Sequence, residues 1–331
     1  MKLLYHRWTV CFMAFFLTVS CIVYLMFFND NTFINIFLIF FIPVMVYNTI
    51  LESYVALTFI SPTNRKVSLE SEGWEQIKLQ HQGPEIFTVR NMRSIKAPLV
   101  LMIHGWRSSS SSMLDRAELY IERGFHVIIM ELPGHGSAEG VKKWNAGVPV
   151  RNLIHLLDNL DEVCNTSLIS DIYFHGHSMG GFVFLRFSRE SIKVRNSELI
   201  RGYILESPLT CYSRIFEESC KMLFVPKILR PLLWKRLMFH FNVINPDFDK
   251  ITNLNDVDVP IWGLPNLPTL VIQSANDELL GQKHHDRLVK AFHNSGRNNL
   301  LTDRVIGDLT HTGARTNSSR NDEINKWLDK N

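Results

Sequence analysis

The 331-residue sequence lacks a marked excess of either charge. It holds 35 Lys and Arg residues and 32 Asp and Glu residues, which gives a formal net charge of +3. Domains that bind nucleic acid gather a clear basic excess on one face, whereas the Lys and Arg residues of this chain are scattered along it. We therefore expect no nucleic acid among its partners.

Cysteine is also scarce, and no two cysteines form a C-x-x-C pair. The count of five is odd, and Cys11 and Cys21 lie inside an apolar stretch. We predict that Cys164, Cys211 and Cys220 are free thiols, which fits a reducing compartment better than a disulfide framework.

The sequence offers no pattern typical of a metal site. His175 and His177 flank Gly176, and His135 lies in a glycine-containing turn upstream, but no carboxylate or cysteine accompanies them at zinc-ligand spacing. We therefore predict neither a metal nor a cofactor.

Two long apolar runs lie near the amino terminus. Residues 8–28 include no charged side chain, and about 20 such residues cross a hydrocarbon core of roughly 30 Å as a helix. A second run covers residues 33–51 and ends at Glu52. We predict two membrane spans, about 8–28 and 33–51, in an anchor that comprises residues 1–66. A buried helix of the globular domain is the alternative for the second run, because Asn48 and Glu52 are unfavourable in lipid.

The charges that flank these runs predict their orientation. Lys2 and Arg7 precede the first run, Arg65 and Lys66 follow the second, and the connection between the runs holds only Asp30. Since Lys and Arg favour the cytoplasmic side, we expect a hairpin in the inner or plasma membrane, with both ends in the cytoplasm. A secretory signal peptide is the less favoured alternative, because no small-x-small cleavage site follows the first run.

Beyond residue 66, short apolar runs rich in β-branched residues alternate with helical patterns. This alternation predicts an α/β domain over residues 67–331 with a mostly parallel, eight-stranded sheet flanked by helices. The predicted strands are 75–80, 85–91, 97–105, 125–134, 171–176, 202–207, 268–277 and 302–309. The predicted helices are about 113–123, 149–163, 180–190, 282–294 and 320–329.

The segment 208–267 is too long for an ordinary connection between two strands. We expect it to hold its own helices as a cap over the strand ends. Within it, residues 220–241 combine basic and bulky apolar side chains. Two interpretations stay open for this stretch: an acyl-binding or membrane-touching lid, and a capping helix packed on the core.

The stretch "HGHSMGG" (175–181) places Ser178 at the centre of a G-x-S-x-G motif. The motif follows a predicted strand and precedes a predicted helix, which is the strand-turn-helix context of a nucleophile elbow. Gly176 and Gly180 fit this context, because the strained turn passes close to its neighbours and leaves no room for a Cβ. The pattern therefore predicts that Ser178 is a nucleophile.

With these motifs in place, the chain from about residue 75 to its end resembles the α/β-hydrolase superfamily. The sequences "IHGW" (103–106), "ELPGHGSAEG" (131–140) and "GHSMGG" (176–181) follow the order and approximate spacing of its serine hydrolases of esterase and monoacylglycerol-lipase type. The resemblance implies the α/β-hydrolase fold and a Ser-Asp-His triad, and it makes His177 a usual neighbour of the nucleophile.

In this fold the acid and the histidine follow the serine along the chain. Asp277 closes a predicted strand where the family places its acid, and Glu206 is the alternative. Among thirteen histidines, His311 is the candidate base, because it follows the last predicted strand and precedes the terminal helix. The family often has glycine before this histidine, whereas this chain has Thr310, which affects the expected loop geometry.

The resemblance also implies an oxyanion hole formed by the backbone N–H groups of Trp106 and Met179. The Trp106 ring either walls an acyl pocket or packs in the core. Together these features predict a membrane-anchored serine hydrolase that cleaves carboxylic esters of lipid-like or acyl substrates through an acyl-enzyme. A thioesterase or peptidase with the same triad and a non-catalytic membrane scaffold remain the alternatives.

Overall fold

The computed structural model describes residues 7–28, 31–62, 66–80, 83–312 and 316–331. Lys2, Asp30 and Arg65, which enter the predicted orientation of the hairpin, lie outside these residues. The chain forms two compact units. The first holds the described residues up to Ser61 together with Lys142–Asn145 and Arg214–Thr252, and the second holds the remainder. The predicted limits of the anchor (1–66) and of the cap (208–267) stay predictions.

The second unit is built on an eight-stranded sheet with the strand order β1-β2-β4-β3-β5-β6-β7-β8. The first two strands run antiparallel to each other, β2 pairs antiparallel with β4, and the other neighbours are parallel. The predicted mostly parallel sheet is therefore confirmed. The strands are β1 (Glu75–Leu79), β2 (Ile86–Asn91), β3 (Ala97–Ile103), β4 (His126–Met130), β5 (Ile169–His177), β6 (Ile200–Glu206), β7 (Thr269–Ser274) and β8 (Leu301–Ile306).

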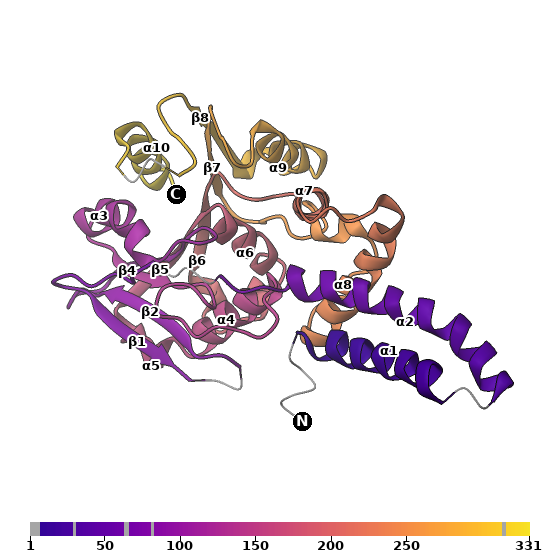
Figure 1. Ribbon diagram of the computed structural model, residues 1–331. Coiled ribbons are helices and arrows are strands. Elements are labelled where there is room, and N and C mark those ends of the chain that lie inside the picture. Colours follow the sequence, from indigo (N-terminus) through magenta and orange to yellow (C-terminus); the bar gives the residue numbers. More distant parts are fainter. Residues whose placement is uncertain (1–6, 29–30, 63–65, 81–82, 313–315) are drawn as a thin grey trace. The chain divides into compact units, whose positions relative to one another are not determined.

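Helices flank both faces of this sheet (Figure 1). On one face, α3 and α10 cover a core in which Tyr120, Trp327 and Leu328 pack against strand residues such as Val100 and Met102. The other face carries α6, whose Phe184 and Phe187 rings lie 5.0 and 5.2 Å from that of Phe174 in β5. The helices of this unit are α3 (Leu114–Glu122), α4 (Gly147–Asp158), α5 (Leu160–Val163), α6 (Met179–Phe187), α9 (Gln282–Asn294) and α10 (Ser318–Leu328).

The first unit contains the two apolar helices, which pack against each other as a hairpin. Helix α1 (Thr9–Phe27) lies close to the predicted limits 8–28. Helix α2 (Thr32–Thr58) runs almost two turns past the predicted end at residue 51. Both are long and apolar enough to cross a membrane by length and composition.

Helix α2 continues past residue 51 in the unit that also contains part of the segment between β6 and β7. This part holds α8 (Arg230–Ile244) and most of α7 (Tyr212–Met222). Helix α8 packs against α2. The side chain of Glu52 is buried, and one of its oxygens lies 3.2 Å from Nε of Arg236 in α8. This pairing offsets the cost of burying the carboxylate. The first part of α2 is mostly exposed, whereas Leu51, Val55 and Ala56 are buried.

Candidate active site

Ser178 occupies the turn between β5 and α6. Its backbone has φ 53° and ψ −110°, a conformation that non-glycine residues rarely adopt and that marks functional turns. The turn is fixed by hydrogen bonds: the Ser178 N–H donates to the Glu206 carbonyl at 3.0 Å, and the Ser178 carbonyl accepts from the Leu209 N–H at 3.1 Å. These two hydrogen bonds hold the serine at the carboxyl end of a central strand.

Two glycines make this turn possible. A Cβ on Gly180 would collide with the backbone carbonyl of Ile103 in β3. A Cβ on Gly176 would lie 2.6 Å from the backbone nitrogen of Gly181, which is closer than real Cβ contacts allow. Helix α6 can therefore approach β3 and β5 only because these two positions carry no side chain.

The structure brings Ser178, His311 and Asp277 together from three segments of the second unit. The Ser178 hydroxyl and His311 Nε2 are 2.9 Å apart, and His311 Nδ1 lies 2.8 Å from an oxygen of Asp277. The side chains of His311 and Asp277 are 3% and 1% exposed. Thr310, which replaces the expected glycine, does not prevent this arrangement.

Asp277 is held in its ionised form. Burial opposes ionisation, but the hydrogen bond from His311 and those from the N–H groups of Leu280 and Gly281 outweigh it and keep the pKa of this carboxyl well below its usual range. An ionised carboxylate only accepts hydrogen bonds, so Nδ1 of His311 carries the proton that Asp277 receives. Nε2 is then left to accept the proton of the Ser178 hydroxyl.

Two further residues hold the loop that carries His311, and neither role was predicted from the sequence. Glu278 accepts hydrogen bonds from the N–H of His311 at 3.1 Å and from the N–H and hydroxyl of Thr312 at 3.2 and 2.8 Å. On the other side, Nε2 of His177 donates to the His311 carbonyl at 3.0 Å. Burial and the nearby Arg116 lower the pKa of His177 to about 3, so this ring is neutral at physiological pH.

The two backbone groups expected to form an oxyanion hole adjoin the serine. Met179 is the first residue of α6, a position whose N–H has no acceptor within a helix. Trp106 follows Gly105, where an added Cβ would lie 3.2 Å from Cβ of Ser178. The Trp106 ring is about one-third exposed and contacts His135 edge-on at 4.9 Å, so it packs partly in the core.

The alternative acid, Glu206, belongs to a different network. Its two oxygens accept hydrogen bonds from Arg116 at 2.8 and 2.5 Å, and Arg320 lies 3.7 Å away. Although burial opposes ionisation, these two guanidinium groups hold the pKa of Glu206 well below its usual range. The carboxylate that bonds His311 is that of Asp277, whereas Glu206 serves the buried core.

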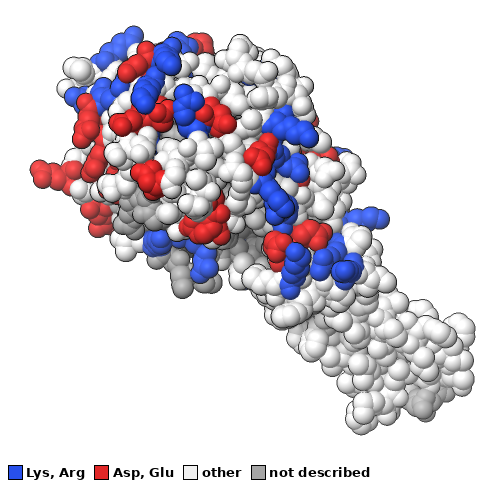
Figure 2. Space-filling view, turned by 90° about the horizontal axis from the view of Figure 1, so that it is seen from above, with Lys and Arg blue, Asp and Glu red and all other residues white. Residues whose placement is uncertain are grey.

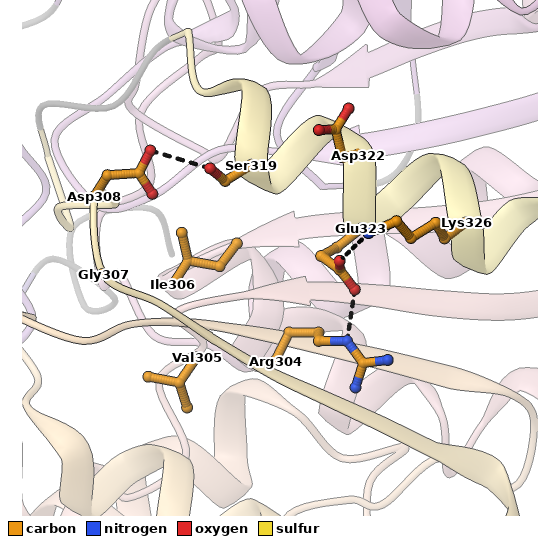
Figure 3. Close-up of a pocket in the computed structure, with 9 residues that line it drawn as sticks. All are labelled: Arg304, Val305, Ile306, Gly307, Asp308, Ser319, Asp322, Glu323 and Lys326. Carbon is orange, nitrogen blue, oxygen red and sulfur yellow. Dashed lines mark hydrogen bonds and ion pairs between the residues drawn. The ribbon is translucent and has the colours of Figure 1, made fainter.

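A pocket of about 400 Å³ between β8 and α10 lies apart from the triad (Figure 3). Three of its charged side chains pair with one another: Glu323 accepts from Arg304 at 2.5 Å and from Lys326 at 2.7 Å. We assign no function to this pocket. Among the residues that the structure describes, no group of three or more His, Cys, Asp or Glu side chains is placed to hold a metal ion. The absence of a metal and of a cofactor from the reaction remains a prediction.

Comparison with known proteins defines the class. A model of the Alpha/beta hydrolase family matches residues 100–294, which is more than half of the chain, so the chain belongs to this family. The fold that the sequence predicted is thereby confirmed.

Among relatives, Phospholipase YtpA of Bacillus subtilis is 28% identical over 112 residues, which are 33% of this chain and 40% of that protein. The match therefore spans well under half of the relative's length. Among solved structures, the Pyrococcus furiosus esterase Pf2001 is similar with a TM-score of 0.56 and 16% identity, over 82% of this chain and 99% of that chain. Est1E of Butyrivibrio proteoclasticus has a TM-score of 0.54 and 15% identity, over 77% and 98% of the two chains.

Proposed function

We propose that this chain is a membrane-anchored serine hydrolase that cleaves carboxylic esters of lipid-like or acyl substrates. The observation that carries the proposal is the continuous hydrogen-bonded path from Ser178 through His311 to Asp277. The names of the similar proteins, a phospholipase and two esterases, favour esters over thioesters and amides. A non-catalytic scaffold is disfavoured because it would have no reason to keep the strained serine and the aligned imidazole together.

The proposed reaction has two halves. His311 Nε2 takes the hydroxyl proton while Ser178 Oγ attacks the ester carbonyl carbon, and the imidazolium then gives that proton to the departing alcohol. A water molecule, deprotonated by the same nitrogen, next attacks the acyl-serine, which releases the carboxylic acid and restores the hydroxyl. Asp277 holds the tautomer and stabilises the transient imidazolium.

The N–H groups of Met179 and Trp106 would receive the negative charge that develops on the carbonyl oxygen. Loss of one such donor typically lowers the rate by about 100- to 1000-fold, so these groups would contribute substantially to catalysis. Because the donors belong to the backbone, they are fixed by the elbow and by Gly105 and need no reorganisation during the reaction.

A fluorophosphonate probe tests the catalytic part of the proposal, since only an activated serine reacts with it quickly. We expect rapid labelling of the folded chain and none of the Ser178→Ala variant. Failure to label the folded protein, or labelling that persists without Ser178, would refute the mechanism. A panel of p-nitrophenyl esters and monoacylglycerols of graded length, with matching thioesters and amides, would then define the substrate class.

Extraction tests the anchor separately. The full chain should stay with membranes in high salt and should leave them only with detergent, because about 20 apolar residues per helix are held by the hydrocarbon core rather than by charge. Release by salt alone would refute the two spans. The proposed location of the hydrolase unit in the cytoplasm would be tested by its protection from protease added outside intact cells.

A further inference from the structure

The carboxyl end of α7 carries a phenylalanine where glycine is the usual residue. The N–H of Val225 donates to the Cys220 carbonyl at 2.8 Å, and the N–H of Phe224 donates to the Lys221 carbonyl at 3.1 Å. This pair of bonds is the common helix end that places its penultimate residue in the left-handed region, and Phe224 has φ +55°. A bulky residue in this conformation costs about 1–2 kcal/mol relative to glycine.

The same phenylalanine is also unfavourably exposed. Its side chain is 88% exposed, more than that of any other large apolar residue that the structure describes. Ile228 and Met222 on the same turn are 81% and 72% exposed. Phe224 is therefore unfavourable in two ways: its backbone is left-handed and its apolar ring is exposed to water. An apolar environment around this turn would remove the cost of exposing the ring.

The segment that contains this turn carries charge of one sign. Between residues 219 and 246 the sequence contains five Lys and Arg residues and no Asp or Glu. Lys221 and Arg230 pair with carboxylates of α7, whereas Lys227 and Lys235 are exposed and make no ion pair with the residues that the structure describes. Lysine is depleted from the core of protein interfaces but is attracted to anionic lipid headgroups, so the composition favours a bilayer over a protein partner.

The turn also belongs to the compact unit that contains the two apolar helices. Helix α2 has 27 residues, which is about 40 Å of helix, so part of it must project beyond a core of roughly 30 Å. Buried Glu52 marks the part that projects, and Arg236 ties α8 to it at 3.2 Å. In Figure 2 the apolar hairpin appears as a surface without charged side chains. Helix α8 and the turn before it are thus held where the hairpin would leave the lipid.

We propose that the turn formed by residues 221–232, which we term the lipid-contact turn, inserts into the interfacial region of an anionic bilayer. Phe224, Ile228 and Met222 would enter the level of the first acyl carbons, while Lys227 and Lys235 would lie among the phosphates. This inference rests on the anchor part of the proposed function and is independent of catalysis.

A label at Ile228 tests the proposal in the full chain. The Ile228→Cys variant is labelled with an environment-sensitive fluorophore and reconstituted into phosphatidylcholine vesicles with about one-third phosphatidylglycerol. The five native cysteines are buried, and the wild-type protein treated in the same way supplies the background. Ile192→Cys is the matched control, because Ile192 is 83% exposed and belongs to the other unit.

We expect the label at residue 228 to emit at shorter wavelength and to be quenched about twofold or more by lipids with a nitroxide near the headgroup, while the label at 192 changes little. Vesicles without phosphatidylglycerol should weaken the effect. Equal behaviour of the two labels would overturn the proposal. The proposal would also be overturned if the shift to shorter wavelength grew with the protein-to-lipid ratio, which indicates contact with a second copy of the chain. A shift without nitroxide quenching would overturn it as well, because it indicates that the chain itself covers the label.

The Phe224→Gly variant provides a second test, in which a loss of quenching cannot be explained by misfolding. Glycine relieves the left-handed backbone, so the variant should unfold at the same temperature or higher in detergent, yet the label at 228 should lose at least half of its quenching. Phe224→Leu, which keeps an apolar side chain, should retain most of it. Undiminished quenching in Phe224→Gly would contradict the assigned role of this ring. Release of the whole chain by high salt would instead refute the anchor, so the two failures are distinguishable.

Discussion

The carboxylate of Glu278 accepts a hydrogen bond from the backbone N–H of His311 at 3.1 Å. The residue next to Asp277 therefore fixes the main chain of the loop whose imidazole Asp277 orients. Two adjacent acidic residues thus have two tasks: one holds the ring and the other holds its backbone.

Removal of the Glu278 carboxylate should lower kcat while the protein stays folded. In Glu278→Ala three hydrogen bonds to residues 311 and 312 are lost, and we expect kcat to fall about tenfold, less than the roughly 100-fold that a 1 Å misplacement costs. Glu278→Gln should recover part of the rate, because its amide oxygen still accepts. Steady-state kinetics with a p-nitrophenyl ester measures the effect, and exposed Glu162→Ala is the control. An unchanged kcat in Glu278→Ala would show that the loop does not need this support.

Substitution of Asp277 should lower activity, whereas substitution of Glu206 should lower stability. Asp277→Asn keeps the shape but removes the charge that fixes the His311 tautomer, so kcat should fall about 1000- to 10,000-fold with little change in unfolding temperature. Glu206→Gln leaves Arg116 buried with a neutral partner and should lower the free energy of unfolding by about 3–5 kcal/mol. Kinetics and thermal unfolding of the two variants provide the comparison. A stable, inactive Glu206→Gln protein together with an active Asp277→Asn protein would reverse the assignment of the acid.

The elbow should not tolerate a methyl group at Gly180. The new Cβ would meet the carbonyl of Ile103, and both partners are backbone, so neither can move cheaply. We expect Gly180→Ala to lower the free energy of unfolding by about 3 kcal/mol or more and to abolish fluorophosphonate labelling. Gly307→Ala is the control, since nothing lies within 4 Å of its Cβ position and its φ is not in the left-handed region. A Gly180→Ala protein as stable and reactive as the control would contradict the close packing of α6 on β3.

Stability should decrease in mild acid because histidines are buried in neutral form. Burial lowers the pKa of His104 to about 4, and its Nε2 accepts from the Leu132 N–H, which a protonated ring could not do. Burial and the proximity of His104 lower the pKa of His135 to about 3. Since unfolded histidines titrate near 6.5, the unfolded chain binds more protons from pH 6.5 down to about 4. The free energy of unfolding therefore falls by about 1.4 kcal/mol per pH unit for each such histidine.

Thermal unfolding of the full chain in detergent from pH 8 to 4 checks this sign. The unfolding temperature should fall steadily below pH 6.5. His285 supplies an internal contrast: burial opposes its protonation, but the hydrogen bond to Asp303 outweighs this and raises its pKa. Its contribution is therefore present below pH 6.5 and is lost as pH rises through the raised value, so His285→Gln should destabilise most at acidic pH. Constant stability between pH 6.5 and 4 would contradict the neutral burial of His104 and His135.

Much of the fold follows from local patterns. All eight strands of the described sheet were predicted, because short apolar runs that end in glycine or polar residues are sufficient to mark them, as at β5 before Ser178. The sequence predicted a membrane span that ends at residue 51 and gave no sign of the helix that continues to Thr58, because the burial of the Glu52 carboxylate depends on Arg236, far along the chain.

Some residues of the candidate site could be predicted from the sequence and others could not. Ser178, Asp277 and His311 were expected from chain order and strand ends, and the structure brings them together. Glu278 could not be identified, since its function depends on a loop more than thirty residues away. The strain at Phe224 was equally invisible, because the turn conformation arises from hydrogen bonds and not from its residue type.

Acid-quenched mass spectrometry tests the central claim most directly. The full chain is mixed with a p-nitrophenyl ester, quenched within the first turnover and digested. We expect the acyl group to be found on the peptide that contains Ser178, to be absent from Ser178→Ala, and to form far more slowly in His311→Ala. Ester cleavage at an undiminished rate in Ser178→Ala, or an acyl group carried by another residue, would contradict this claim.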